Sequence, residues 1–163
     1  MKPPSVAQVR ELPRLYETAV EEAFIDRNGH MNVQHYLGVH DAAGWPFFRS
    51  LGIDDRYFQE RKLGIFDLEH HLRYFDECHL GDRLAVHAWL LELGAKRLHA
   101  LWFIVNETRE KVANSLEFVC THADLAARKT APWPDDVRAA LERVQETQGT
   151  PSWPAPVCGV MGV

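Results

Sequence analysis

The spacing of apolar side chains changes character along the chain. Residues 15–22 (LYETAVEE) alternate loosely between apolar and polar positions and predict a first strand. From Val33 to Leu51 the apolar positions recur at intervals of three and four, which predicts a long helix with one buried face. Residues 52–63 are mixed and charged, and they predict a loop or a short second helix.

Beyond Ile65 the period switches to two. The runs 65–75, 83–93, 96–107 and 111–125 are joined by short turns and predict an antiparallel meander. In the first of these runs, unbroken alternation would put one set of side chains on one face (Phe66, Leu68, His70, Leu72, Tyr74) and a second set on the other (Asp67, Glu69, His71, Arg73).

One long apolar helix and one antiparallel sheet must bury each other. We therefore expect an α+β protein in which a curved sheet of about five strands wraps around the helix. Val137, Leu141 and Val144 predict a short helix near the C-terminus. The expected domain covers residues 15–146, with an N-terminal extension at 1–14 and a Pro- and Gly-rich tail at 147–163.

Composition narrows the class of protein. A length of 163 residues suits one domain, and a net charge of −5 argues against nucleic-acid binding, which needs a basic surface. No apolar run approaches the ~18 residues of a membrane span, and the N-terminus lacks the apolar core of a signal peptide. Cys78, Cys120 and Cys158 fit neither a disulfide framework nor a zinc site. We expect a cytoplasmic protein that binds neither nucleic acid nor membrane.

Common hydrolase and metal motifs are missing from the sequence. None of the serines stands in a G-x-S-x-G turn, and Cys120 lies in an apolar run that suits a core position. His30, His35 and His40 are five residues apart, so they cannot converge on one ion from one helix face. We expect no metal site.

The loop 26–32 (DRNGHMN) is the strongest local signal for function. Asn32 immediately precedes the helix and suits an N-cap, and Gly29 suits a positive φ. A helix start also offers free backbone N–H groups and a positive dipole end, which can stabilise the oxyanion formed when a carbonyl is attacked. The Asp26 carboxylate can then serve as general base or nucleophile. Capping and chemistry both remain open at this point.

Two further groups of polar side chains are candidates. Glu69 lies on the predicted polar face of its strand, where it is either a second catalytic acid or a solvated side chain. Lys96, Arg97 and His99 open a later strand. Such a cluster is usually solvated charge, but near an active site it can bind phosphate groups.

The order of elements and the loop together resemble a known family. The pattern D-x-N-G-H-M-N-x-x-x-Y is formed by Asp26, Asn28, His30, Asn32 and Tyr36, and it resembles the hotdog-fold acyl-CoA thioesterases of the 4-hydroxybenzoyl-CoA thioesterase-like superfamily. A closer resemblance covers residues 16–142. There GHMN, LGID, E-x-H-L-R-Y, LGAKRLH and THADLAARK-x-A-P-W-P are similar to the betainyl-CoA thioesterase-like group of carnitine breakdown.

The resemblance implies an enzyme that hydrolyses an acyl-CoA to free acid and coenzyme A without a cofactor. It implies a homodimer or homotetramer with active sites at the subunit interface. By position, Asp26 corresponds to the acid that attacks the thioester carbonyl or directs water onto it, and Glu69 is the second choice. Backbone N–H groups around His30–Asn32 would form the oxyanion hole. Lys96, Arg97 and His99 would contact the phosphates of coenzyme A.

Two other functions remain open on the same fold. A hydratase or dehydratase of enoyl thioesters would use a His–Asp or His–Glu pair on the central helix, and a non-catalytic acyl-CoA-binding module would need only a pocket. One aromatic set could line an acyl pocket suited to a quaternary ammonium such as betaine, or could simply pack the helix against the sheet: Trp45, Phe47, Phe48, Tyr57, Phe58 and Phe66.

Overall fold

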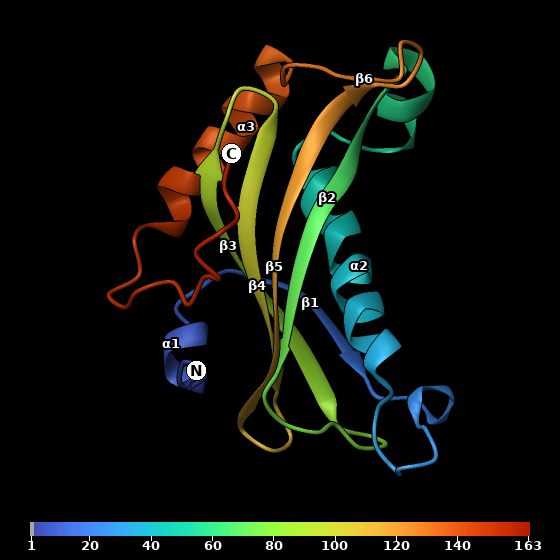
Figure 1. Cartoon of the computed structure of the whole chain (residues 1–163), viewed down its shortest axis with the longest axis vertical. Helices are drawn as coiled ribbons and strands as arrows, with labels where there is room; N and C mark the ends of the chain where they lie inside the picture. Colours follow the sequence, from blue (N-terminus) through green and yellow to red (C-terminus); the bar gives the residue numbers. More distant parts are fainter. Residues whose placement is uncertain (1) are drawn as a thin grey trace.

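A curled antiparallel sheet surrounds one long helix in the computed structural model, which describes residues 2–163. The helix is α2 (Val33–Ser50), and it lies in the concave face of the sheet (Figure 1). The strands are β1 (Arg14–Ala19), β2 (Leu63–Tyr74), β3 (Arg83–Leu93), β4 (Arg97–Asn106), β5 (Lys111–Asp124) and β6 (Lys129–Thr130). They follow the order β1-β3-β4-β5-β2, with β6 paired to β5. The expected α+β hotdog architecture is confirmed.

Shorter helical segments complete the chain. They are α1 (Val6–Val9), the 3-10 turn η1 (Glu22–Phe24), the π-helical turn η2 (Tyr57–Arg61) and α3 (Asp135–Gln148). For residues 52–63 the sequence left a loop or a short helix open, and the structure has the short helical turn η2 there. The short helix expected near the C-terminus is α3. Within residues 2–163, no helix combines the length and the apolar character needed to cross a membrane.

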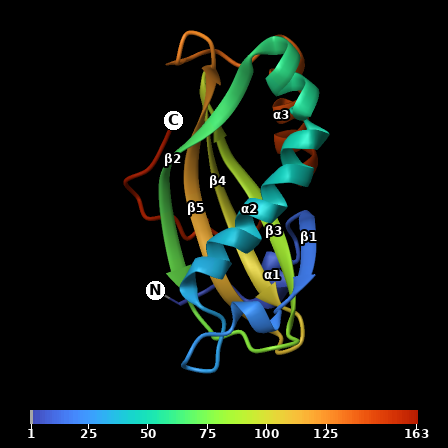
Figure 2. The same cartoon turned by 90° about the vertical axis from the view of Figure 1, so that its right-hand side faces the viewer.

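The main core lies between α2 and the concave face of the sheet (Figure 2). Tyr36, Ala43 and Phe47 are buried along one side of α2, as their spacing predicted, and Val39 is buried with them. They belong to one cluster with the sheet side chains, among them Trp102, whose ring centroid lies 5.6 Å from that of Phe47. Burying each large apolar side chain contributes about 1.5–3 kcal/mol, so this layer fixes α2 against the strands.

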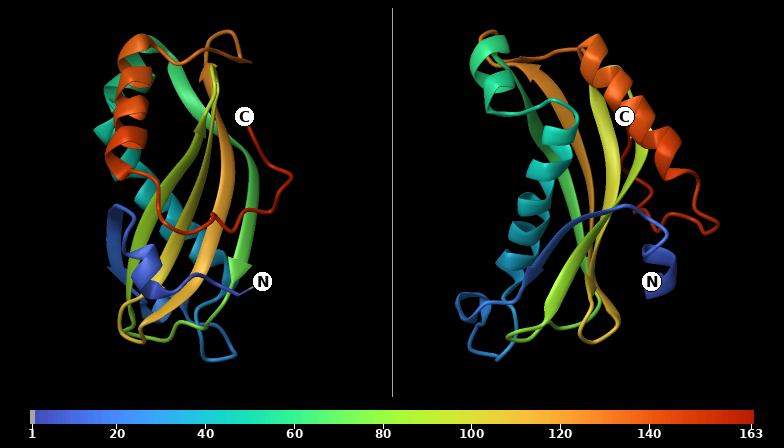
Figure 3. Two further views of the ribbon diagram at one scale, coloured as in Figure 1. Left: turned by 90° about the vertical axis from the view of Figure 1, so that its left-hand side faces the viewer. Right: turned by 180° about the vertical axis from the view of Figure 1, so that it is seen from behind.

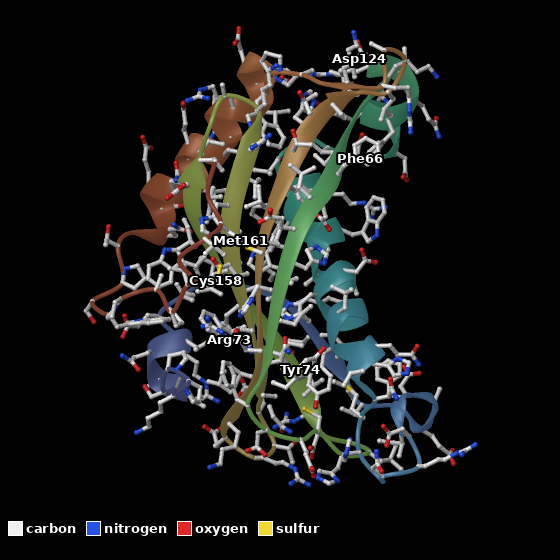
Figure 4. The ribbon with its side chains drawn as sticks, viewed as in Figure 1. Phe66, Arg73, Tyr74, Asp124, Cys158 and Met161 are labelled. Carbon is white, nitrogen blue, oxygen red and sulfur yellow. The ribbon has the colours of Figure 1, made fainter. Side chains whose placement is uncertain are left out.

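The C-terminal tail covers the convex face of the sheet (Figure 3). Trp153 is buried there, with its ring centroid 5.0 Å from that of Trp89 and 5.9 Å from that of Phe103. Further along, the Cys158 N–H donates to Oε2 of the buried Glu117 at 2.6 Å. Figure 4 shows Cys158 and the tail in front of the strands, on the side away from α2. The tail is therefore part of the folded unit.

Strand β2 contains a β-bulge that the sequence pattern did not reveal. Asp67 pairs with Cys120 and Glu69 pairs with Val119, so Leu68 is an extra residue without a partner on β5. An extra residue shifts the phase of alternation for everything that follows it. The expectation of one unbroken alternation from Phe66 to Tyr74 is therefore wrong.

The two edges of the sheet differ in whether their outer hydrogen-bonding groups are paired. At the edge formed by β1, the pairing between β1 and β3 ends at His87. Further along β3, the Gln148 side chain forms the hydrogen bonds that a neighbouring strand would otherwise form. Its amide donates to the Leu90 carbonyl at 2.6 Å and accepts from the Leu90 N–H at 3.0 Å. At the opposite edge of the sheet, β2 pairs with β5 on its inner side, and no strand within residues 2–163 pairs with its outer side. This open edge carries exposed apolar side chains, among them Phe66 and Tyr74 at either end (Figure 4).

Candidate active site

The loop before α2 holds Asp26 in a fixed position. The Asn28 N–H donates to its Oδ1 at 2.8 Å, and the Asn32 side-chain amide donates to its Oδ2 at 3.3 Å. The loop is closed by a bridge between Ile25 and Met31. The carboxylate is half-buried, so it is held by donors on both oxygens while remaining accessible to a small molecule.

Asn32 connects the loop to the helix. Its side-chain oxygen accepts the Gln34 N–H at 3.1 Å and caps α2, which confirms the N-cap expected from the sequence. The same side chain donates to Asp26 through its amide nitrogen. His30 lies alongside, with Nδ1 at 4.0 Å from Asp26 Oδ1 and Nε2 at 3.9 Å from Glu77 Oε1. The structure thus brings Asp26, His30 and Asn32 together at the start of α2.

Two of the backbone N–H groups expected to form the oxyanion hole are already hydrogen-bonded within the fold. The Met31 N–H donates to the Cys78 carbonyl at 2.8 Å, and the Asn32 N–H donates to the Phe24 carbonyl at 2.9 Å. Both groups are already satisfied and are not free to form an oxyanion hole, so of the expected His30–Asn32 donors only the His30 N–H stays a candidate. The Val33 N–H, the first of α2, has no hydrogen-bond partner among residues 2–163, and it lies at the positive end of the helix dipole.

A cavity of about 570 Å³ lies between α2 and β2, within the size range of small-molecule sites. It extends along the exposed side of α2 from Gln34 to Phe48 and reaches Phe58 of η2. Trp102 and Phe118 of the sheet also line it, and their rings meet edge to face with centroids 5.1 Å apart. The walls are mainly apolar and aromatic, as the pocket of an acyl group requires.

A few polar side chains also line this cavity. Asp67 and His70 lie on β2, and the imidazole Nε2 is 3.0 Å from the carboxylate Oδ2. Asp41 lies on α2. His40 is completely buried, and burial lowers its pKa to about 4, so the ring is neutral near pH 7. Its Nε2 donates to Asn114 Oδ1 at 2.7 Å, whereas its Nδ1 has no partner among residues 2–163.

Glu69 lies on the opposite side of the sheet from the cavity. It pairs with Val119, and directly paired residues share a face, whereas Cys120 and Phe118 point into the core beside α2. The bulge at Leu68 is the physical reason for this placement, because it leaves Asp67 and His70 on the concave face instead. The placement of Asp67 and Asp41 at the cavity could not be predicted from the sequence. No local sequence pattern indicates the bulge, or which side of α2 borders the cavity.

The predicted phosphate-binding group is divided between two environments. Lys96 and Arg97 are exposed at the turn between β3 and β4, at the opposite end of the sheet from the loop that starts α2 (Figure 1). His99 is only 3% exposed, and its Nε2 lies 3.0 Å from Glu117 Oε1 on the convex side. A buried imidazole paired in this way presents no surface to a phosphate group.

Comparison with known proteins agrees with this geometry. A model of the Thioesterase-like superfamily matches residues 20–141, which include the Asp26 loop, α2 and β2. The chain belongs to this superfamily. Within residues 2–163, no group of three His, Cys, Asp or Glu side chains is arranged to hold a metal ion.

Named relatives of this thioesterase-like chain come from several bacteria. A Rhizobium meliloti protein named L-carnitine dehydrogenase/betainyl-CoA thioesterase is 31% identical over 133 residues, covering 82% of this chain and 27% of the relative. The chain thus spans about a quarter of that relative's length. A Pseudomonas aeruginosa protein named betainyl-CoA thioesterase is 28% identical over 148 residues, covering 91% of this chain and 93% of the relative.

Among solved structures, a Staphylococcus aureus protein determined in complex with CoA has a TM-score of 0.85 to this chain. It is 22% identical and the match covers 93% of this chain and 96% of that protein. This likeness establishes the shared fold.

Proposed function

We propose that this chain is an acyl-CoA thioesterase that hydrolyses an acyl-CoA to a free acid and coenzyme A. The observation that carries the proposal is the Asp26 carboxylate, which two donors hold beside the first turn of α2. There the Val33 N–H has no partner within the described part of the chain, residues 2–163. Membership of the Thioesterase-like superfamily and the names of its relatives support the same reaction.

The proposed chemistry uses groups of this chain and water. The thioester carbonyl lies at the start of α2, where the Val33 N–H and the helix dipole stabilise the negative charge that forms on its oxygen. Asp26 acts as general base, taking a proton from water as the hydroxyl adds to the carbonyl carbon, or it attacks that carbon itself. Collapse of the intermediate breaks the carbon–sulfur bond and releases the thiolate of coenzyme A, which takes up a proton. Where Asp26 itself attacks, this collapse leaves a mixed anhydride, and water then hydrolyses the anhydride to the free acid and the Asp26 carboxylate.

Asn28, Asn32 and His30 support this carboxylate. The Asn28 N–H and the Asn32 side-chain amide donate to the Asp26 carboxylate, and these two hydrogen bonds fix the orientation of the carboxylate relative to the helix start. His30 lies close to both Asp26 and Glu77, where it can relay a proton between the carboxylate and solvent. No cofactor enters the proposal, since coenzyme A is part of the substrate.

The acyl group is proposed from the relatives and the cavity together. The Pseudomonas aeruginosa and Rhizobium meliloti relatives carry betainyl-CoA thioesterase in their names. The cavity beside α2 has room for a betainyl-type or another small acyl group. Lys96 and Arg97 stay proposed contacts for the phosphates of coenzyme A because they are exposed cations, and the buried His99 leaves this set.

A homodimer formed through the β2 edges belongs to the same proposal. The open edge runs over the 12 residues of β2 and carries Phe66, Leu68 and Tyr74, each 44–48% exposed. A long apolar edge is a template for pairing with another strand. A second copy would continue the sheet and bury these side chains.

The free cysteines suit the reducing cytoplasm, which we propose as the location.

The test is the release of free thiol from a panel of acyl-CoA thioesters by the purified chain. Hydrolysis of at least one member is expected. Binding of acyl-CoA without thiol release from any member would favour the non-catalytic module instead. Hydration of an enoyl-CoA without thiol release would favour the hydratase.

A further inference from the structure

One loop of the chain contacts both halves of the proposed site. Residues 76–82 connect β2 to β3 and lie beside the loop before α2 (Figure 2). The Cys78 carbonyl accepts the Met31 N–H at 2.8 Å, and the Asp76 carbonyl accepts the Tyr36 hydroxyl at 3.4 Å. Met31 belongs to the loop before α2, whereas Tyr36 belongs to the first turn of the helix. The loop 76–82 therefore ties the two to each other.

The same loop also approaches a polar side chain of the site. Glu77 Oε1 lies 3.9 Å from His30 Nε2. The next side chain, that of Cys78, is completely buried in the main core. Three consecutive residues of the loop thus contact the helix, the imidazole and the loop before α2, so a shift of residues 76–82 would disturb all three contacts at once.

A buried carboxylate anchors the end of this loop. Asp82 is 5% exposed. Its Oδ2 accepts hydrogen bonds from the His79 N–H at 2.9 Å, from the Asn106 side-chain amide at 2.7 Å and from Arg109 Nε at 2.8 Å. Asn106 ends β4 and Arg109 lies in the turn to β5, so these bonds fasten the loop to the sheet. His79 directly follows Cys78, so the anchor lies one residue from the carbonyl that holds the loop before α2.

The Asp82 carboxylate is ionised in the folded protein. Burial raises the pKa of its carboxyl, but the hydrogen bonds from His79, Asn106 and Arg109 outweigh burial and hold the pKa below its ordinary value. Hydrogen bonds to a charged acceptor are about twice as strong as those between neutral groups. Neutralising the carboxylate would weaken all three bonds and leave buried donors poorly satisfied. The position of the loop 76–82 therefore depends on this one charge.

The position of this loop matters for the proposed chemistry. Hydrolysis needs the Asp26 carboxylate and the Val33 N–H to act on the same carbonyl group. Cys78 holds the loop that carries Asp26. Asp76 holds the helix that begins at Val33. Because a misplacement of about 1 Å can lower a rate about a hundredfold, a small shift of residues 76–82 is expected to be visible in the rate.

We propose that Asp82 is a positioning residue of the active site, which sets the separation between the Asp26 carboxylate and the Val33 N–H through the loop 76–82. The inference rests on the proposed thioesterase function. Because Asp82 is buried, it acts on the reaction only through this loop. Loss of its charge is therefore expected to lower kcat and to leave KM nearly unchanged.

Asp82→Asn tests the proposal, because it keeps the shape of the side chain and removes its charge. We expect kcat for thiol release to fall at least about tenfold and KM to change less than about threefold. We also expect the Met31 amide to exchange its proton with solvent at least about tenfold faster, as measured by NMR-detected hydrogen exchange. The Leu90 N–H, which donates to Gln148 further along β3, is the internal reference and should change less than about threefold.

Two further variants act on the same network with less change to the buried side chains. Arg109→Gln removes one donor to Asp82 and keeps the carboxylate. Tyr36→Phe keeps the ring and removes the hydroxyl that donates to Asp76. Each is expected to lower kcat about threefold to tenfold and to change KM less than about threefold.

The matched control breaks a different ion pair of the same turn. Arg10 pairs with Glu107 and Glu110, which lie between β4 and β5 as Arg109 does. Arg10→Gln removes these pairs and leaves the three donors of Asp82 in place. It is expected to change neither kcat nor the exchange of the amides in the loop before α2.

The outcomes separate this inference from the proposed function. A kcat within about twofold of the unmodified chain in both Asp82→Asn and Arg109→Gln overturns the inference alone. So does a fall in kcat without faster Met31 exchange, or an equal fall in Arg10→Gln. If Asp82→Asn does not fold, kcat and KM of Arg109→Gln and Tyr36→Phe decide. Failure of the unmodified chain to release thiol from any acyl-CoA overturns the proposed function, and the inference with it.

Discussion

Asp67 and His70 face the same cavity although three positions separate them on one strand. In a regular strand such residues point to opposite faces, but the bulge at Leu68 restores them to one side. Their side chains meet at 3.0 Å between Oδ2 and Nε2. The bulge thus places two polar side chains at the cavity and turns Glu69 away from it.

Asn32 both caps α2 and contacts Asp26, and these two roles can be separated. Asn32→Ser keeps a side-chain oxygen for the cap, so the free energy of unfolding is expected to change by less than about 0.5 kcal/mol. It removes the amide that donates to Asp26, so kcat for thioester hydrolysis is expected to fall about tenfold. Urea denaturation and steady-state kinetics measure the two effects, and an unchanged kcat would show that Asn32 is only a cap.

Acid is expected to destabilise the fold through His40. Its pKa in the folded protein is about 4, below the 6.5 of an unperturbed imidazole, because of burial. The unfolded chain therefore binds the proton first, and stability is lost as pH falls from 6.5 toward 4. Between pH 7 and pH 5 this group alone should cost about 2 kcal/mol.

Urea denaturation at both pH values measures that loss, and His40→Gln is the control. The buried His87 and His122 also have lowered pKa values, mainly because of burial, and they contribute in the same direction. The loss between pH 7 and pH 5 should therefore be smaller in His40→Gln without vanishing. An identical loss in the variant would show that His40 does not carry the effect.

We expect the chain to dimerise through the open edge of β2. A lysine in place of Leu68 introduces a charge into the proposed contact between two β2 strands, so Leu68→Lys is expected to weaken dimerisation at least about tenfold. Val160→Lys changes an exposed apolar side chain of the tail and serves as the control. Sedimentation velocity distinguishes monomer from dimer. A monomeric unmodified chain, or a dimer that persists in Leu68→Lys, would contradict the proposal.

The tail is expected to contribute to stability. Trp153 is 7% exposed and packs against Trp89 and Phe103, so Trp153→Ala should lower the free energy of unfolding by about 3 kcal/mol. Chemical denaturation measures this loss. A change below about 1 kcal/mol would mean that the tail leaves the sheet without affecting the rest of the fold.

Apolar periodicity was sufficient to predict the central helix, the meander and their mutual packing. Tyr36, Ala43 and Phe47 are buried where the helical spacing required, because one helix within one sheet leaves a single way to bury that face. Asn32 was also predictable as the cap, since the signal is local.

Features set by distant contacts were not predictable. Either phase of alternation from Ile65 to Tyr74 gives an acceptable strand, and only pairing with β5 selects the bulge at Leu68. Likewise, the Met31 and Asn32 N–H groups looked free in the sequence, but the carbonyls of Cys78 and Phe24 occupy them. The cavity acids Asp41 and Asp67 come from separate elements that meet only in the folded chain.

The central claim is that Asp26, at the start of α2, acts on the thioester. Thiol release from the best acyl-CoA substrate should be compared between the unmodified chain, Asp26→Asn and Glu69→Gln. We predict that Asp26→Asn lowers kcat by at least about a hundredfold, whereas Glu69→Gln, on the far side of the sheet, retains activity. Activity of Asp26→Asn within about threefold of the unmodified chain, together with its loss in Glu69→Gln, would contradict the assignment.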